Sequence, residues 1–235
     1  MNGFHEEILE LIKKNSGKPT QHTFLDGYLG NEHPRYPISA PVLRRIAKEW
    51  MSDHCDLSAR DIQRILTSLI KGKSSTEKCM AGILLDVTTK AQRKFDPASF
   101  DRWLDHLVGW AEVDSVCTGP YTITEIPNNF TVWKSLLLRF SKSKNINKRR
   151  ASLVLLCSPT RTVTDARLAR VAFQNIDQLK LEKEILITKA ISWLLRSMVK
   201  NYRTEIIVYL KRNGDILPKI AIRETLKKLR TGKKT

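Results

Sequence analysis

The chain has 235 residues, 41% of them hydrophobic, which is enough for a buried core and excludes a disordered segment. A formal net charge of +17 predicts a polyanionic partner, with nucleic acid ahead of an anionic membrane surface. No apolar run approaches the length of about 20 residues that a membrane span needs, and no cluster of cysteine and histidine indicates a zinc or other metal site.

Apolar residues recur with helical spacing along most of the chain. The spacing predicts successive helices, among them segments at 8–12, 42–50, 62–69 and 80–87. Helix starts are expected at Ser58, at Asp96 before Pro97 and at Thr164 before Asp165, and helix ends at Gly72 and at Asn213-Gly214. Segments with β propensity, such as 121–126, are short and isolated. We expect about a dozen helices of roughly 10 to 18 residues.

Amphipathic helices joined by short loops predict an all-α protein in which antiparallel helix pairs stack into an α-solenoid. A compact helical bundle is the alternative, because no repeat of fixed period aligns along the chain. We expect a single domain over residues 1–235, with a frayed basic tail at 228–235. The four cysteines are expected to pack as small apolar residues in a reducing cytosol.

The segment 108–117, VGWAEVDSVC, breaks the apolar pattern at Asp114. If the segment is helical, Trp110 lies four residues before Asp114 on the same face. The carboxylate is then partly desolvated beside an aromatic ring, where it could stabilise a developing cation. Alternatively, Asp114 is an N-cap for the turn that follows.

Cationic residues crowd the segment 142–150, directly before the apolar run 151–157. They are Lys142, Lys144, Lys148, Arg149 and Arg150. Such a cluster is either a solvated helix face or, at a helix start, a clamp for DNA phosphates.

The segment 186–200 breaks its helical pattern at Trp193. Its apolar residues fill one broad arc of a helix, whereas Trp193 falls outside that arc among cationic residues. These are Lys189, Arg196 and Lys200. The indole either packs against a neighbouring helix or beneath lysine stems, or forms an aromatic platform for a sugar or base beside phosphates.

Four blocks stand in order along the chain: Tyr28 followed by SAPVLRR at 39–45, GWAEVDSV at 109–116, NKRRASLVLL at 147–156 and KAISWLLR at 189–196. Together they resemble the AlkD-like family of alkylpurine DNA glycosylases, over roughly residues 20–225. The resemblance implies an α-solenoid of antiparallel HEAT-like helix pairs with a concave basic face. This chain departs from the family pattern at three positions. Gly109 stands where the family often has Trp, and Ser192 stands where it has Gly. Asn147 stands three residues before Arg150, where the family commonly has an aromatic residue.

The resemblance also implies roles for individual residues. Trp110, Asp114 and Trp193 are the expected catalytic residues, and Arg150 is expected to contact a phosphate. Further contacts with DNA are expected from Tyr28, Arg44, Lys148, Arg149, Lys189, Arg196 and Lys200.

The implied activity is hydrolysis of the N-glycosidic bond of N3- or N7-alkylated purines in double-stranded DNA, as the first step of base excision repair. Such a base is cationic and leaves without prior protonation, so a single carboxylate suffices. We expect a monofunctional, monomeric enzyme in the cytoplasm, associated with the nucleoid if the source is prokaryotic. No metal, organic cofactor or membrane is expected to take part.

Two other functions fit the same fold and charge. A non-enzymatic α-solenoid that binds DNA by backbone and shape would have no turnover to lose when Asp114 is changed to Asn. A scaffold for acidic proteins would not show binding to duplex DNA that weakens steeply with salt.

Overall fold

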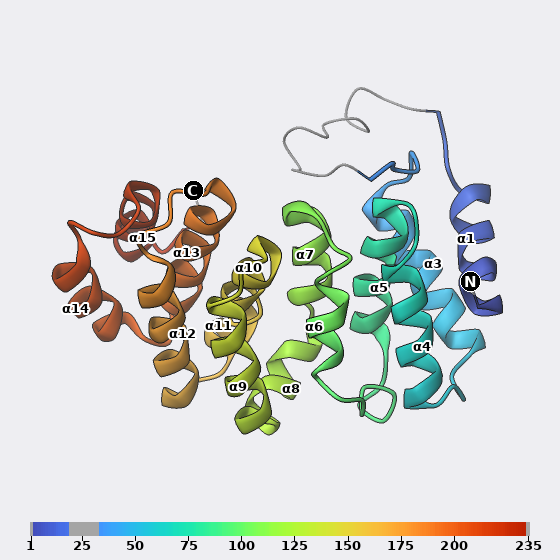
Figure 1. Cartoon of the computed structure of the whole chain (residues 1–235), viewed down its shortest axis with the longest axis horizontal. Helices are drawn as coiled ribbons and strands as arrows, with labels where there is room; N and C mark the ends of the chain where they lie inside the picture. Colours follow the sequence, from blue (N-terminus) through green and yellow to red (C-terminus); the bar gives the residue numbers. More distant parts are fainter. Residues whose placement is uncertain (1, 19–32, 234–235) are drawn as a thin grey trace. The chain divides into compact units, whose positions relative to one another are not determined.

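The computed structural model describes residues 2–18 and 33–233, and every regular element in those ranges is an α-helix (Figure 1). The predicted all-α class is confirmed, and the succession of helices that pack against near neighbours in the chain is compatible with an α-solenoid. Contacts divide the chain into two compact units, residues 1–119 and 120–235. Within the described ranges no helix is both long and apolar enough to cross a membrane.

The first unit is built around α5. Its helices are α1 (Gly3–Lys14), α3 (Ala40–Asp53), α4 (Ala59–Ile70), α5 (Ser75–Val87), α6 (Ser99–Trp103) and α7 (Gly109–Cys117). Helix α5 packs against α3, α4 and α7, while α1 covers α3 and α4. Because α5 has neighbours on several sides, residues on most of its circumference are buried, including the polar residues of its first turn.

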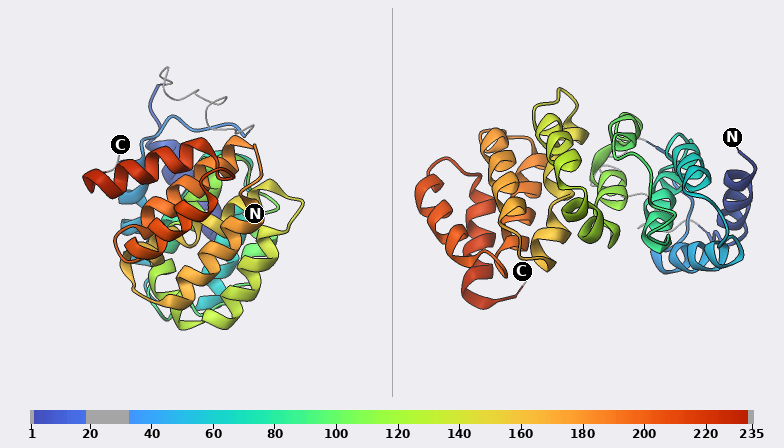
Figure 2. Two further views of the ribbon diagram at one scale, coloured as in Figure 1. Left: turned by 90° about the vertical axis from the view of Figure 1, so that its left-hand side faces the viewer. Right: turned by 90° about the horizontal axis from the view of Figure 1, so that it is seen from below.

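The second unit is built around α13. Its helices are α8 (Tyr121–Asn128), α9 (Phe130–Ser141), α10 (Ile146–Val154), α11 (Cys157–Thr162), α12 (Ala166–Leu179), α13 (Ile185–Met198), α14 (Arg203–Asn213) and α15 (Lys219–Thr231). Helix α13 packs against α10, α11 and α15, and Figure 2 shows these helices side by side. Its apolar arc, which includes Ile187, Ile191 and Leu194, is buried as predicted. Each such side chain contributes about 2 kcal/mol when it leaves water.

The segment 121–126, in which the sequence shows β propensity, is helical and forms most of α8. Pro120 precedes it with helical backbone angles, and proline is well suited to a helix start. Tyr121 and Ile126 are buried in the unit, where α8 contacts α9 and α11. Packing therefore outweighs the local β propensity, as it commonly does in short segments.

Most described helices have 11 to 14 residues, within the predicted range, but several are shorter, and α6 has 5 residues and α11 has 6. Helix α15 extends to Thr231, so part of the segment expected to be frayed is helical. Cys117 and Cys157 are buried as expected, but Cys55 is exposed, so the expectation was wrong for Cys55.

Helix starts were predicted with mixed success. The Ser58 hydroxyl accepts the N–H of Asp61 and caps α4, as predicted. Asp165, rather than Thr164, caps α12 by accepting the N–H of Arg167. The carboxylate of Asp96 accepts the N–H of Ala98, although α6 begins one residue later.

Helix ends lie close to the predicted glycines. Helix α4 ends at Ile70, and the N–H of Gly72 donates to the carbonyl of Leu69 just beyond that end. Helix α14 ends at Asn213, with Gly214 as its C-cap.

Candidate functional site

Trp110 and Asp114 lie one helical turn apart on α7, and both side chains are half-buried. Residues four apart share a helix face, so the carboxylate and the indole belong to the same face of α7. The alternative role of Asp114 as an N-cap is wrong, because α7 continues through Asp114 to Cys117. The carboxylate therefore projects from the body of a helix.

The start of α7 has an unusual backbone. Gly109 has a φ of 72°, in the left-handed region that favours glycine, and the preceding Val108 has no side chain that could cap the helix. The carboxylate of Glu112 instead accepts the backbone N–H of Val108 at 2.8 Å. The same carboxylate is fully buried, and its Oε1 lies 2.9 Å from Nδ1 of His33.

Sequence reasoning missed both Glu112 and His33. Glu112 is a charged residue in the same mostly apolar stretch that drew attention to Asp114, so one available signal was overlooked. His33 offers no such signal, because it is 79 residues away in the chain from the acid that it contacts.

The other side of α7 lies against the backbone of α5. A Cβ added to Gly82 would lie 2.1 Å from the carbonyl oxygen of Ser115, so these two backbones approach more closely than any side chain would allow. The hydroxyl of Ser115 donates to the carbonyl of Cys79 on α5 at 2.9 Å. Since Ser115 adjoins Asp114, this contact helps to fix where the carboxylate stands.

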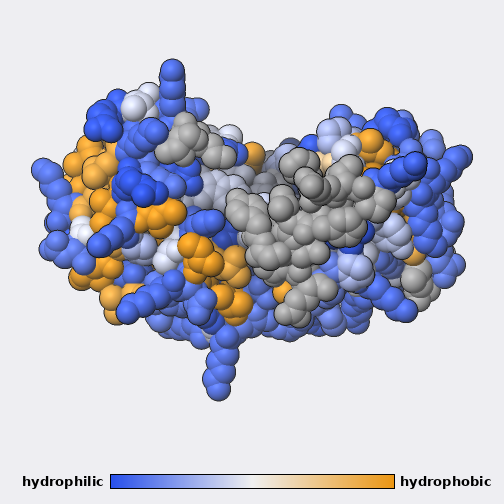
Figure 3. Space-filling model, turned by 90° about the horizontal axis from the view of Figure 1, so that it is seen from above, coloured by the Kyte–Doolittle hydropathy of each residue, from blue (hydrophilic) through white to orange (hydrophobic). Residues whose placement is uncertain are grey.

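In the second unit, Trp193 is half-buried on α13, and Lys189, one turn earlier, is exposed. Lys200 is also exposed but lies in the turn after α13, which ends at Met198. The surface around this helix is not uniformly cationic, because Leu181 and Ile185 at its start are exposed. Figure 3 likewise shows apolar groups among hydrophilic ones on one face of the second unit.

Arg196 is held by groups of its own unit. Its guanidinium forms an ion pair with Glu224 on α15, with Nη2 3.1 Å from Oε2. The Ser192 hydroxyl donates to the same oxygen at 2.6 Å. The serine that departs from the family pattern thus orients the partner of a predicted DNA contact.

The basic cluster before residue 151 is partly engaged in structural contacts. Arg150 is only 5% exposed and donates from Nη1 to the carbonyl of Leu186 in the first turn of α13. Arg149 forms an ion pair with Glu182 at 2.8 Å and donates to two loop carbonyls. Lys148 is half-buried. Because Arg150 donates to Leu186, it ties α10 to the start of α13, the helix that carries Trp193.

Arg44 is exposed on α3 of the first unit. Its charge acts on Asp86, near the end of α5. Burial raises the pKa of the Asp86 carboxyl to about 6, and the charges of Arg93 and Arg44 oppose this shift. One oxygen of Asp86 is buried without a hydrogen bond. Tyr28 lies outside the described residues.

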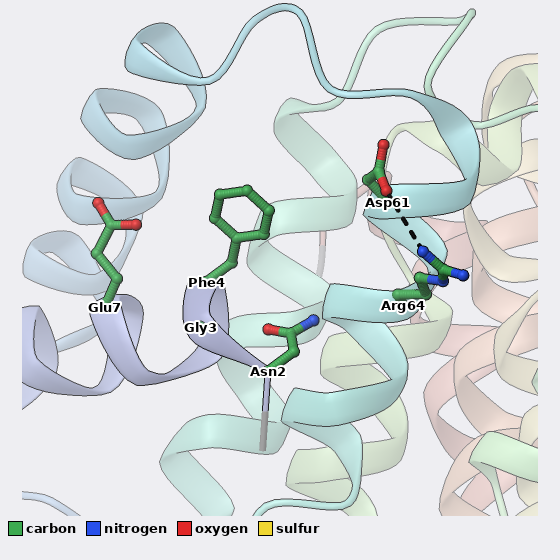
Figure 4. A pocket seen from close by; sticks show the side chains of 6 residues that line it. All are labelled: Asn2, Gly3, Phe4, Glu7, Asp61 and Arg64. Carbon is green, nitrogen blue, oxygen red and sulfur yellow. Dashed lines mark ion pairs between the residues drawn. The ribbon is translucent and has the colours of Figure 1, made fainter.

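The described site residues thus lie in three places: Trp110 and Asp114 on α7, Arg44 on α3, and the others on or next to α10 and α13. A separate cavity of about 440 Å³ in the first unit contains an ion pair between Asp61 and Arg64 (Figure 4). It is lined by Asn2, Gly3, Phe4, Glu7, Asp61 and Arg64, none of which is a predicted site residue. Residues 2–18 and 33–233 contain no group of three or more side chains that could hold a metal ion.

Comparison with known proteins gives a consistent result. A family model described as "DNA alkylation repair enzyme" matches residues 9–229. A solved structure described as "Predicted DNA alkylation repair enzyme from Enterococcus faecalis" superposes with a TM-score of 0.73 at 17% identity, covering 92% of this chain and 99% of that chain. At this identity the likeness shows a shared fold. No curated protein matches the chain.

Proposed function

The chain belongs to the DNA alkylation repair enzyme family, and from that premise we propose that it is a DNA glycosylase that releases N3- or N7-alkylated purines from duplex DNA. Family membership supports a role in the repair of alkylation damage. The observation that carries the finer proposal is the half-buried carboxylate of Asp114 on the same helix face as the indole of Trp110.

The proposed reaction breaks the bond between C1′ of the deoxyribose and the purine nitrogen. The bonding electrons go to the cationic base, which leaves as a neutral molecule without a general acid. Asp114 stabilises the positive charge that develops on the sugar and accepts a proton from the attacking water, whose oxygen bonds to C1′. The products are a free base and an abasic site.

Trp110 and Trp193 would pack their rings against the deoxyribose. An aromatic face attracts a cation, so the two indoles favour the charged sugar of the transition state and exclude bulk water. This assignment requires Trp193 to contact the sugar rather than only its neighbours in the second unit. Its half-buried indole, one helical turn from the exposed Lys189, supports that assignment.

The proposed DNA contacts differ in exposure and in the partners described for them. Lys189, Lys200 and Arg44 are exposed, and Arg149 and Arg196 form ion pairs with glutamates. Arg150 is proposed to meet a phosphate at the start of α13, where its guanidinium already donates to a backbone carbonyl. Lys148 and Tyr28 complete the proposed set. The protein is further proposed to act as a monomer in the cytoplasm, without a cofactor.

The decisive experiment measures release of free base from N-methylated duplex DNA. Wild type is compared with Asp114→Asn, which keeps the size of the side chain and removes its charge. Asp53→Asn, at an exposed position of α3, is the matched control for the loss of one negative charge. DNA affinity is recorded for all three proteins.

We expect release by wild type and by the Asp53 variant, and a loss of at least about 100-fold in the Asp114 variant at similar affinity. No release by any of them, with tight DNA binding by all, would instead establish a non-enzymatic DNA-binding protein for these lesions. Failure to bind duplex DNA at low salt would refute both functions.

A further inference from the structure

Two helices of the first unit begin with the same arrangement of side chains. At the start of α5, Glu77 accepts the backbone N–H of Ser74 at 2.8 Å and lies 2.9 Å from Nε2 of His5. At the start of α7, Glu112 accepts the backbone N–H of Val108 at 2.8 Å and lies 2.9 Å from Nδ1 of His33. In both, a histidine from a distant segment holds a buried carboxylate that caps a helix.

The two helix starts differ in how much else supports them. Ser74 has a hydroxyl that accepts the N–H of Glu77, which completes a capping box on α5. Val108 has no polar side chain, and the next residue has a positive φ. The hydroxyl that supports α5 thus has no counterpart at Val108, and Glu112 provides the side-chain capping described at the start of α7.

His33 is itself fixed by the start of α5. The N–H of Ser75 donates to the carbonyl of Pro34 at 2.9 Å, and the N–H of Tyr36 donates to the hydroxyl of Thr76 at 3.0 Å. These bonds hold the segment that begins at His33 against α5. The backbone next to His33 is therefore anchored on α5, and the imidazole reaches Glu112 from that anchored segment.

The charge of Glu112 also interacts with that of Lys78, which is buried in the first turn of α5. Burial lowers the pKa of Lys78, and the negative charge of Glu112 acts in the opposite direction. A buried carboxylate is stable only when it is paired or hydrogen-bonded. The N–H of Val108, the ring of His33 and the charge of Lys78 together meet that requirement.

The direction of these side chains around α7 connects this arrangement to the candidate site. At about 100° per residue, Asp114 lies about 40° from Trp110, whereas Glu112 lies about 160° from Asp114. Glu112 thus anchors the buried side of the helix whose opposite side carries Trp110 and Asp114. We therefore expect a change at Glu112 to move that opposite side of the helix.

We propose that Glu112, oriented by His33, is a positioning residue for the reaction: it fixes the start of α7 and so sets the geometry of Trp110 and Asp114. This role rests on the proposed glycosylase activity. It predicts that Glu112 acts on the rate of bond cleavage rather than on the affinity for DNA.

The test uses Glu112→Ala, which removes both contacts, and Glu112→Gln, which keeps an oxygen for the N–H of Val108. Ser58→Ala is the control for the loss of a helix cap in the same unit, because the Ser58 hydroxyl caps α4 and is not part of the segment that holds His33. His33→Ala, at a partly exposed ring, provides a folded variant if Glu112→Ala does not fold. Each protein is assayed for single-turnover base release, DNA affinity and thermal unfolding.

A second readout does not require activity. The protein is labelled with 5-fluorotryptophan, and the ¹⁹F signal of Trp110 is assigned from its absence in Trp110→Phe. The five tryptophans of the chain give a spectrum simple enough for this assignment.

We expect Glu112→Ala to lower the single-turnover rate about 10- to 100-fold, to change the affinity for DNA less than about twofold and to shift the signal of Trp110. Glu112→Gln should restore the rate to within about threefold of wild type. His33→Ala should reproduce the effect in weaker form. Ser58→Ala should lower the melting temperature while leaving the rate and the signal unchanged.

An unchanged rate and signal in folded Glu112→Ala and His33→Ala would overturn the proposal. An equal loss of rate in the Ser58→Ala control would also overturn it, because the effect would then reflect the general stability of the unit. If wild type releases no base, the proposed activity fails, and the signal of Trp110 still decides whether Glu112 positions α7.

Discussion

Replacement of Gly82 by alanine should displace the helix that carries Asp114. The added Cβ would lie 2.1 Å from the carbonyl oxygen of Ser115, whereas real Cβ atoms essentially never approach within 3.0 Å of another heavy atom. The two helices must therefore separate by at least 3.0 − 2.1 = 0.9 Å along that line. The obstacle is backbone on both sides, so no side-chain rotation can relieve it.

The displacement should affect the reaction more than it affects stability. Overpacking costs about 1–3 kcal/mol, and alanine recovers about 1 kcal/mol through its higher helix propensity, so the net loss is about 0–2 kcal/mol. A misplacement of about 1 Å can reduce a reaction rate about 100-fold. We therefore expect a loss of roughly 10- to 100-fold in single-turnover base release, with DNA affinity nearly unchanged.

The assay measures base release at saturating protein, together with DNA affinity and thermal unfolding. Gly3→Ala is the control, because an added Cβ there meets no atom within 4 Å and the residue lies in a helix of the same unit. A Gly82→Ala protein that releases base at the wild-type rate and melts at a higher temperature would refute the reasoning, since the helices would then have accommodated the methyl group without moving Asp114.

Three further predictions concern charge. The raised pKa of Asp86, about 6, means that ionisation of this carboxyl costs stability, and the cost grows as the pH rises from 4 to above 6. Asp86→Asn should therefore raise the free energy of unfolding at pH 7 by about 1 kcal/mol and should give little gain at pH 4. The pKa shift sets an upper limit of about 3 kcal/mol, which partial exposure of the carboxyl reduces. Equal gains at both pH values in denaturant titrations would contradict this explanation. Lys189→Ala and Lys200→Ala, both at exposed positions, should each weaken duplex binding regardless of sequence and reduce the slope of log K against log salt by about 1, and an unchanged slope would remove that lysine from the DNA contacts. Arg150→Ala should lower the free energy of unfolding by about 1–3 kcal/mol even without DNA, because it leaves the Leu186 carbonyl without its buried donor, whereas a melting temperature equal to that of wild type would assign Arg150 to DNA binding alone.

The sequence predicted what depends on local pattern. Helical spacing identified the apolar arc of α13, and the four-residue spacing of Trp110 and Asp114 was enough to place them on one helix face. Thr164 and Asp165 are both good cap residues, and local pattern alone did not decide between them. The helical state of 121–126 was missed because burial of Tyr121 and Ile126, not propensity, determines it.

What depends on distant contacts could not be predicted. Arg150 reads as one member of an exposed basic run, yet it is buried because α13, more than 30 residues later in the chain, provides its acceptor. Arg196 meets Glu224 only because α13 and α15 pack together. Tertiary packing determines which residue a long charged side chain contacts. The spacing of apolar residues along the chain does not predict that partner.

The left-handed backbone of Gly109 limits how this protein could change over evolutionary time. The family pattern that this chain resembles often has a tryptophan at this position, but a side chain with a Cβ would be strained here by about 1–3 kcal/mol at a φ of 72°. A single mutation from glycine to tryptophan would therefore be costly unless the turn into α7 changed at the same time. A second aromatic ring next to Trp110 is therefore least costly when the backbone of the turn into α7 changes together with the residue.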